Sequence, residues 1–257
     1  MPSNPISGIG YFFQGLSLIF KPGIRQWVLI PLLINIILFS ALIYFAWLYF
    51  PVASEFFMAQ VQGYLPDWAW LADLMRWLIL PLFIVLALTV IFFGFTFLGN
   101  LIAGPFNGLL SVAVEKHLTG ETPVDASSGS LFQGIISAIT ESIGKLFYYV
   151  KWAIALLIIS FIPIINIASP ILWFLFVAWI ICLEYADVAL GRNNYNFSAQ
   201  RQLLAEKRML SLGFGSTVTL VMLIPVINFF VMPTAVAGVT AMWVREFKGR
   251  ISLQTEL

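Results

Sequence analysis

Four long stretches of this sequence contain no charged residue, and they determine what the chain can fold into. Charged side chains are costly inside a bilayer, whereas about 20 consecutive apolar residues are enough for a helix that spans it. Only 10% of all residues are charged, against about 25% in soluble domains. The sequence therefore predicts an all-α integral membrane protein with a single membrane domain, residues 1–257. The charge-free stretches are 26–54, 77–114, 152–183 and 209–244.

The first two stretches are long enough to cross the membrane without interruption. Residues 26–50 would form about 37 Å of helix at about 1.5 Å per residue, which exceeds an apolar core of about 30 Å. Residues 77–103 give a helix of similar length before glycines and asparagines loosen the pattern. We expect two full transmembrane helices here, joined by an extracytoplasmic segment, 51–76.

Prolines divide the third and fourth stretches in the same way. Proline removes a backbone donor and clashes with the preceding turn, so the helical pieces on either side reach only about 16 to 20 Å. We therefore predict two re-entrant helical hairpins, 152–183 and 209–244, with their tips at membrane depth. Four ordinary crossings by kinked helices are the alternative, because transmembrane helices tolerate proline. The two breaks read IPIIN (162–166) and IPVIN (224–228), followed by Pro170 and Pro233.

The distribution of positive charge predicts the sidedness of these segments. All Lys and Arg residues except Arg76 fall in four segments, which share one side if each broken stretch leaves the membrane where it entered. Cytoplasmic segments carry an excess of Lys and Arg, so we place these four in the cytoplasm and residues 51–76 outside. The four are the N-terminal residues 1–25, a helical segment 104–151, the segment 184–208 and the tail 245–257.

An apolar stripe precedes the first span. Its residues recur at spacings of three and four, which places them on one face of a helix. We predict an interfacial amphipathic helix at residues 5–20, lying along the membrane surface. The stripe consists of Ile6, Ile9, Phe13, Leu16 and Phe20.

The residues that open the first span offer only hydrogen-bond donors. A helix N-terminus directs free N–H groups and the positive end of its dipole at an anion, Gly23 permits close approach to the main chain, and Arg25 adds a planar fork. Sulfate suits such a pocket better than phosphate, which often carries a proton that needs an acceptor. Anchoring of the helix at the headgroups by Lys21 and Arg25 explains the same residues equally well. The segment reads Lys21-Pro22-Gly23-Ile24-Arg25-Gln26.

No carboxylate, amine, guanidinium or imidazole lies inside the four charge-free stretches. Ion-coupled pumps usually carry Asp, Glu or His at membrane depth, so this absence weakly favours passive movement of a solute. The embedded amides Asn107, Asn166 and Asn228 are candidates to line a pathway, although amides more often hydrogen-bond neighbouring helices. Glu115 and Glu184, outside the stretches, are further candidates and leave coupled transport open.

The sequence gives no indication of an enzyme, a metal site or a cofactor. No Ser/His/Asp grouping, metal-ligand cluster or phosphate-binding loop occurs at a recognisable spacing. His117, the only histidine, has no second histidine or cysteine nearby, and we interpret it as part of a solvated helix end. A net charge of +1 gives no reason to expect a nucleic-acid partner.

Several short motifs follow one another in a characteristic order along nearly the whole chain. They read KPGIR (21–25), AGPFNGLL (103–110), LWFLF (172–176) with EYAD (184–187), and FFVMP (229–233) leading to TAMWV (240–244). Together they resemble the CysZ sulfate permeases of bacteria, from about residue 5 to residue 247. Each motif alone is unspecific, and the order and spacing carry the likeness.

The resemblance implies sulfate uptake across the bacterial inner membrane for cysteine biosynthesis. It implies a homo-oligomer of spanning helices and hemi-penetrating hairpins, surrounded by membrane lipids. It also implies that Gly23, Ile24 and Arg25 contact sulfate, with Ile24 where the family usually has leucine; the amide of Gln26 is a further candidate donor.

The chain departs from the family pattern at two places. Val112 stands where the family tends to carry a glutamate, and Val188, Ala189 and Gly191 replace a proline and acidic residues. The resemblance therefore gives no support to a pore role for these two segments, although Glu115 remains near Val112. A membrane scaffold or regulatory subunit without transport activity of its own is the alternative function.

Overall fold

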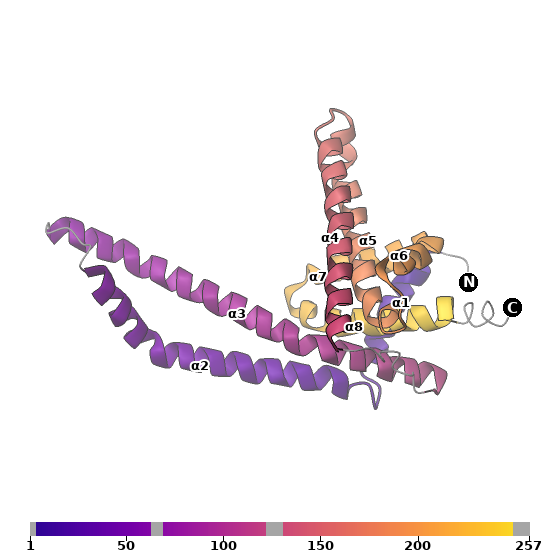
Figure 1. Cartoon of the computed structure of the whole chain (residues 1–257), viewed down its shortest axis with the longest axis horizontal. Coiled ribbons are helices and arrows are strands. Elements are labelled where there is room, and N and C mark those ends of the chain that lie inside the picture. The colour runs from indigo at the N-terminus through magenta and orange to yellow at the C-terminus, as the bar shows by residue number, and fades with distance from the viewer. Residues whose placement is uncertain (1–3, 63–68, 122–130, 249–257) are drawn as a thin grey trace. The chain divides into compact units, whose positions relative to one another are not determined.

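The computed structural model describes residues 4–62, 69–121 and 131–248, and these residues form helices joined by short turns (Figure 1). Within these ranges five helices contain a segment long and apolar enough to cross a membrane, which confirms the predicted all-α membrane fold. The elements are α1 (Pro5–Leu18), α2 (Gln26–Gln62), α3 (Ala69–Thr119), α4 (Leu131–Ser160), the 3₁₀ turn η1 (Ile165–Ala168), α5 (Ser169–Leu190), α6 (Phe197–Glu206), α7 (Arg208–Met222), α8 (Pro225–Trp243) and the π-helical turn η2 (Val244–Lys248).

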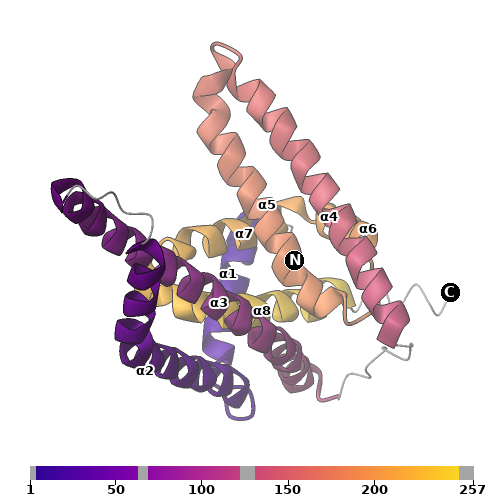
Figure 2. The same cartoon turned by 60° about the vertical axis from the view of Figure 1, so that its left-hand side comes forward.

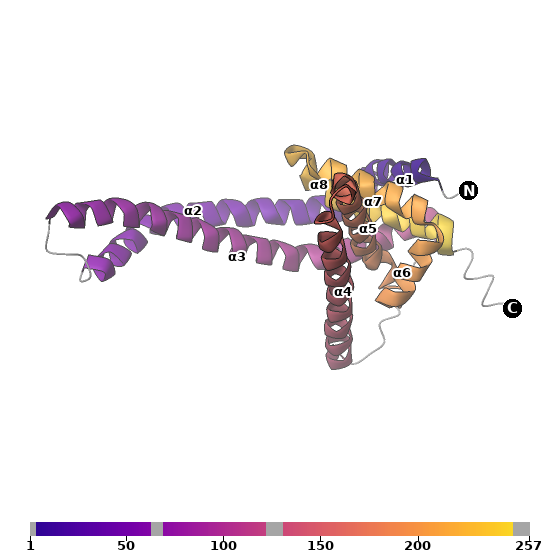
Figure 3. The same cartoon turned by 90° about the horizontal axis from the view of Figure 1, so that it is seen from above.

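The chain divides into two compact units, which we call the hairpin unit (Leu29–Pro105) and the core unit (Met1–Val28 and Phe106–Leu257). In the hairpin unit, α2 and α3 run antiparallel (Figures 1 and 3). Phe83 of α3 stacks on Phe57 of α2 with ring centroids 4.6 Å apart. Most of the other apolar side chains that the structure describes in this unit are exposed, as expected of helices that face lipid.

The two predicted spans lie in α2 and α3, and both helices continue beyond them. α2 extends to Gln62 and α3 runs on through Pro105 to Thr119. The middle of the predicted 51–76 segment and most of the 245–257 tail lie outside the described residues. The flanks of the 51–76 segment are helical rather than an irregular connection.

The core unit is built around α1, α5, α7 and α8. α1 packs against α7 and α8, and α5 packs against the same two helices. Glycines bring the backbones together: a Cβ atom at Gly8 would lie 2.1 Å from the carbonyl oxygen of Leu210, and one at Gly15 would lie 2.2 Å from that of Thr234. Such close crossings depend on the absence of a side chain, as in many membrane helix pairs.

α1 has two apolar faces. One face, which includes Tyr11, Phe12 and Leu18, is buried against the core unit. Of the predicted stripe, Ile6, Ile9 and Phe13 form the other, exposed face, whereas Leu16 packs against the core and Phe20 lies beyond the end of the helix. The predicted helix is present but ends at Leu18 rather than at residue 20, and the insertion of its exposed face into the membrane surface stays a prediction.

The hairpin of α4 and α5 is longer than the charge-free residues alone suggested (Figure 2). α4 has 30 residues and α5 has 22, because both helices continue through charged positions. Lys145 pairs with Asp187 at 2.6 Å, so these charges neutralise each other across the hairpin. Each arm is therefore long enough to span by length and composition, and the depth that the hairpin reaches stays a prediction.

The first proline break falls between α4 and α5, as the sequence indicated, whereas the second is shorter than predicted: α8 begins at Pro225 and continues through Pro233, because a helix inside a packed bundle tolerates an internal proline. Ile164 adopts a positive φ of 74° in the turn after α4, and a proline occupies the first turn of α5. α8 also opens with a proline, which is favourable at a helix start because that N–H would be unpaired anyway. α7 has 15 residues, or about 22 Å of helix, which is less than an apolar core of about 30 Å.

Candidate functional site

The segment between α1 and α2 forms a tight turn at the start of the first span. Gly23 has a positive φ of 84°, a conformation that favours glycine. The N–H groups of Ile24 and Arg25 donate to the carbonyl oxygen of Lys21 at 3.1 and 3.0 Å. Within the described residues, the N–H groups of Gly23 and Gln26 have no acceptor, so these two main-chain donors are available to a ligand.

The side chains of this turn divide into an anchor and two exposed polar groups. Ile24 is 1% exposed and packs in the hydrophobic core of the core unit. The side chains of Arg25 and Gln26 are exposed. Ile24 holds the turn by apolar packing, a role that leucine could fill equally well, while the neighbouring polar side chains remain free.

A cavity of about 640 Å³, which we call the loop cavity, lies between this turn and the last turns of α3. Lys116 and His117 line its far wall, and no carboxylate is among the described residues that line it. Arg25 is not part of the lining, although it is adjacent in sequence. The residues around the cavity are Pro22, Gly23, Ile24, Gln26, Trp27, Leu109, Val112, Ala113, Lys116 and His117.

Sequence reasoning did not assign Lys116 or His117 to this site. Both side chains are exposed at the end of α3, which agrees with the predicted solvated helix end for His117. Their position opposite the turn follows from the contact of Trp27 with Phe106, whose ring centroids are 6.5 Å apart.

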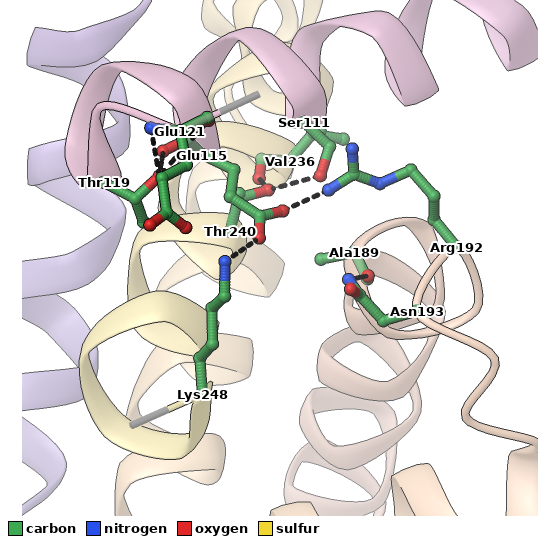
Figure 4. Close-up of polar contacts among 10 residues, drawn as sticks. All are labelled: Ser111, Glu115, Thr119, Glu121, Ala189, Arg192, Asn193, Val236, Thr240 and Lys248. Atoms are coloured by element: carbon green, nitrogen blue, oxygen red, sulfur yellow. Dashed lines mark hydrogen bonds and ion pairs between the residues drawn. The ribbon is translucent and has the colours of Figure 1, made fainter. Parts of the chain in front are cut away.

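Glu115 lies on the same helix but points into a separate buried cluster (Figure 4). Its side chain is 0% exposed and pairs with Arg192 and, at 2.8 Å, with Lys248. Next to it, Thr240 donates to Ser111 at 3.0 Å. Two atoms of the Arg192 guanidinium, Nε and Nη1, are buried without a partner among the described residues. Two cations facing one carboxylate leave this cluster with excess positive charge.

The other pathway candidates do not come together in the chain. Glu184 accepts a hydrogen bond from the Tyr149 hydroxyl at 2.6 Å. Asn166 and Asn228 are exposed near the turns of the two broken hairpins, and those turns lie apart in Figures 1 and 2. Asn107 is half-buried in α3. The pathway role of these residues stays a prediction.

Comparison with known proteins decides the family. The family model described as "Sulfate transporter CysZ/Etoposide-induced protein 2.4" matches residues 11–233. The chain belongs to this family. It is also 40% identical over 257 residues, the full length of both chains, to the "Sulfate transporter CysZ" of Pseudomonas fluorescens (strain Pf0-1). The predicted resemblance to the CysZ family is thereby confirmed.

This CysZ-family chain contains a second buried polar cluster that the sequence did not reveal. Tyr11 of α1 donates to Glu246 at 2.6 Å, and Lys207 pairs with the same carboxylate. Burial raises the pKa of Tyr11, and its hydrogen bond to Glu246 raises this pKa further. The cluster ties α1 to the turn η2, which follows α8. Nothing in the local sequence signals a contact between residues so far apart along the chain.

Proposed function

We propose that this protein is a sulfate permease of the bacterial inner membrane that admits sulfate for cysteine biosynthesis. Its membership of the CysZ family and its likeness to a named sulfate transporter support this function. The observation that carries the proposal is the loop cavity, whose described lining offers donors and basic groups without a carboxylate.

Sulfate is captured at the start of α2 in this proposal. The free N–H groups of Gly23 and Gln26 and the positive end of the helix dipole meet the anion from one side. Lys116 approaches from α3, and the exposed Arg25 folds over the anion from solvent. Monohydrogen phosphate would direct its hydroxyl at donors that cannot accept it, and this unsatisfied contact favours sulfate.

In this proposal sulfate moves down its own electrochemical gradient, without coupling to another ion. The charge-free stretches contain no carboxylate or histidine that could carry a proton alongside sulfate. The turns of the two broken hairpins lie apart within one chain (Figure 2). A passage lined by both turns therefore requires more than one copy, which fits the homo-oligomer that the family resemblance implies.

Uptake of labelled sulfate into liposomes that contain only this protein tests the function. We expect sulfate to accumulate until its gradient is dissipated, with no requirement for an imposed proton gradient. A scaffold or regulatory subunit would give no uptake by a folded protein, and that result would refute the proposed function.

Sulfate binding to the purified protein tests the site. Arg25→Ala removes a charged donor and is expected to weaken sulfate binding about tenfold, and Lys116→Gln several-fold. Arg245→Gln, at an exposed position outside the loop cavity, is the matched control and should leave the affinity unchanged. Unchanged affinity in both site variants would remove this turn from the proposal while leaving transport itself to the liposome assay.

A further inference from the structure

A second cavity of about 640 Å³, which we call the basic cavity, lies among α4, α5, α6 and α7. It shares no lining residue with the loop cavity. α4 contributes Tyr148, Lys151 and Trp152, whose spacing of three and four places them on one face of the helix. In the core unit α4 packs against α5 and α6, and α7 packs against the same two helices, so the cavity is a feature of this packing.

Three cations converge on the basic cavity: Lys151 from α4, Arg201 from α6 and Arg208 from α7. None of the described residues that line it is a carboxylate, and within the described part of the chain none of the three forms an ion pair. By contrast, Lys145, Arg192, Lys207 and Lys248 all pair with carboxylates. Unpaired cations in one cavity repel each other, and an anionic ligand would relieve that repulsion.

Aromatic side chains hold the cavity in shape. The Tyr148 ring lies 4.9 Å from the guanidinium carbon of Arg201, in a cation–π contact. The indole N–H of Trp179 donates to the Tyr148 hydroxyl at 3.1 Å, which fixes the same ring from α5. Trp152 completes the aromatic wall. Tryptophan and tyrosine are typical of the interface between headgroups and acyl chains.

The position of the cavity along α4 matches that interface. Lys151 is the last charged residue before the charge-free stretch 152–183, so the apolar part of the helix begins next to it. The adjoining face of α4 is apolar and open, with Phe147 and Ile158 72% and 61% exposed. A ligand in the cavity would therefore have its anionic group at Lys151 and an apolar surface extending away from it.

We propose that the basic cavity binds the headgroup phosphate of an anionic phospholipid, with the acyl chains lying along α4. Basic pockets between membrane helices at the cytoplasmic side bind such headgroups. A free inorganic anion would meet the same cations but would gain nothing from the exposed apolar face. Sulfate capture at the loop cavity is not needed for this interaction, so the two sites can fail independently.

Native mass spectrometry of the full-length protein in detergent tests the proposal. The protein is incubated with phosphatidylglycerol or with phosphatidylcholine of the same chain length, and retained lipid is titrated. We expect preferential retention of phosphatidylglycerol. Lys151→Gln/Arg208→Gln, at two exposed positions, should weaken that retention about 10- to 30-fold, and Arg245→Gln should not change it. If the double variant does not fold, Lys151→Gln alone should give a loss of about fivefold.

Three results would overturn the proposal. The first is equal retention of phosphatidylglycerol and phosphatidylcholine, and the second is undiminished retention of phosphatidylglycerol by the folded variants. The third is displacement of phosphatidylglycerol by millimolar sulfate or inorganic phosphate, which would identify the cavity as a site for a free anion. A loss of lipid retention that leaves sulfate affinity intact would support the lipid site separately from the proposed function.

Discussion

Among the predicted pathway candidates, Glu115 is a fully buried carboxylate that pairs with two cations. A fully buried carboxylate is tolerated only when its charge is compensated, and Arg192 and Lys248 supply that compensation. Its first role is therefore to hold the end of α3 against the segment after α5 and against η2. The Glu115 carboxylate would repel a passing sulfate unless both cations stay close to it.

Glu115→Gln should destabilise the protein by about 3 kcal/mol, because Arg192 would lose its only described partner while still buried. Thermal unfolding in detergent measures this loss. Glu121→Gln is the control, since Glu121 is exposed on the same end of α3, and it should change stability by less than about 0.5 kcal/mol. Equal small effects of the two substitutions would contradict a structural role for the buried cluster.

The sequence predicted the turn of the candidate site but not its opposite wall. Gly23 and Arg25 stand out because local rules relate glycine and a helix start to anion binding. Lys116 and His117 carry no such signal, because their place beside the turn depends on how α3 packs in the core unit. The same limit applies to Glu115, whose partners are distant in sequence.

Among the helices, the contacts of α1 depend on the absence of side chains at its crossing points. A Cβ atom at Gly15 would lie 2.2 Å from the Thr234 carbonyl oxygen and 2.6 Å from the Gly238 nitrogen. These are backbone atoms of α8, so the clash cannot be relieved by a rotamer change. α1 would have to move away from α8 and lose part of its buried face.

Gly15→Ala should therefore destabilise the protein by about 1 to 3 kcal/mol, the range for overpacking in a close-packed interior. Gly10→Ala is the matched control on the same helix, because a Cβ atom there meets nothing within 4 Å. Since alanine favours helix over glycine, this control should be neutral or stabilising by up to about 1 kcal/mol. The melting temperatures of both variants in detergent decide the matter, and a Gly15→Ala protein as stable as Gly10→Ala would show that α1 does not pack as described.

The existence of the helices was predictable from charge-free runs and proline positions, whereas their ends were not. Charged residues were used as boundaries for the broken hairpins, but α4 and α5 continue through Lys145 and Asp187, which pair with each other. Pairing of opposite charges across a hairpin cannot be read from either helix alone. The length of a charge-free stretch therefore underestimates the length of the helices that contain it.

For the chain as a whole, re-entry of the broken hairpins into the membrane stays a prediction that chemical labelling can test. α7 is too short for a straight crossing, while α4 and α5 are long enough, so helix length no longer decides for both hairpins. The distribution of Lys and Arg requires only that each hairpin begins and ends on one side. Chemical access to the turns distinguishes tips inside the membrane from tips that emerge outside.

Cysteines at Asn166 and Asn228, labelled with a membrane-impermeant maleimide, provide that access test. If the hairpins are re-entrant, neither cysteine reacts when the reagent is added outside intact cells, because both tips lie within the membrane. Both should react slowly in inside-out vesicles, and sulfate in the pathway should slow them further. Cys182, the only native cysteine, is 0% exposed and gives the unlabelled baseline. Arg245→Cys, in the predicted cytoplasmic tail, should react readily in inside-out vesicles alone. Rapid labelling at Asn166→Cys from outside would show that the α4–α5 hairpin crosses fully, in agreement with the lengths of its arms and against re-entry.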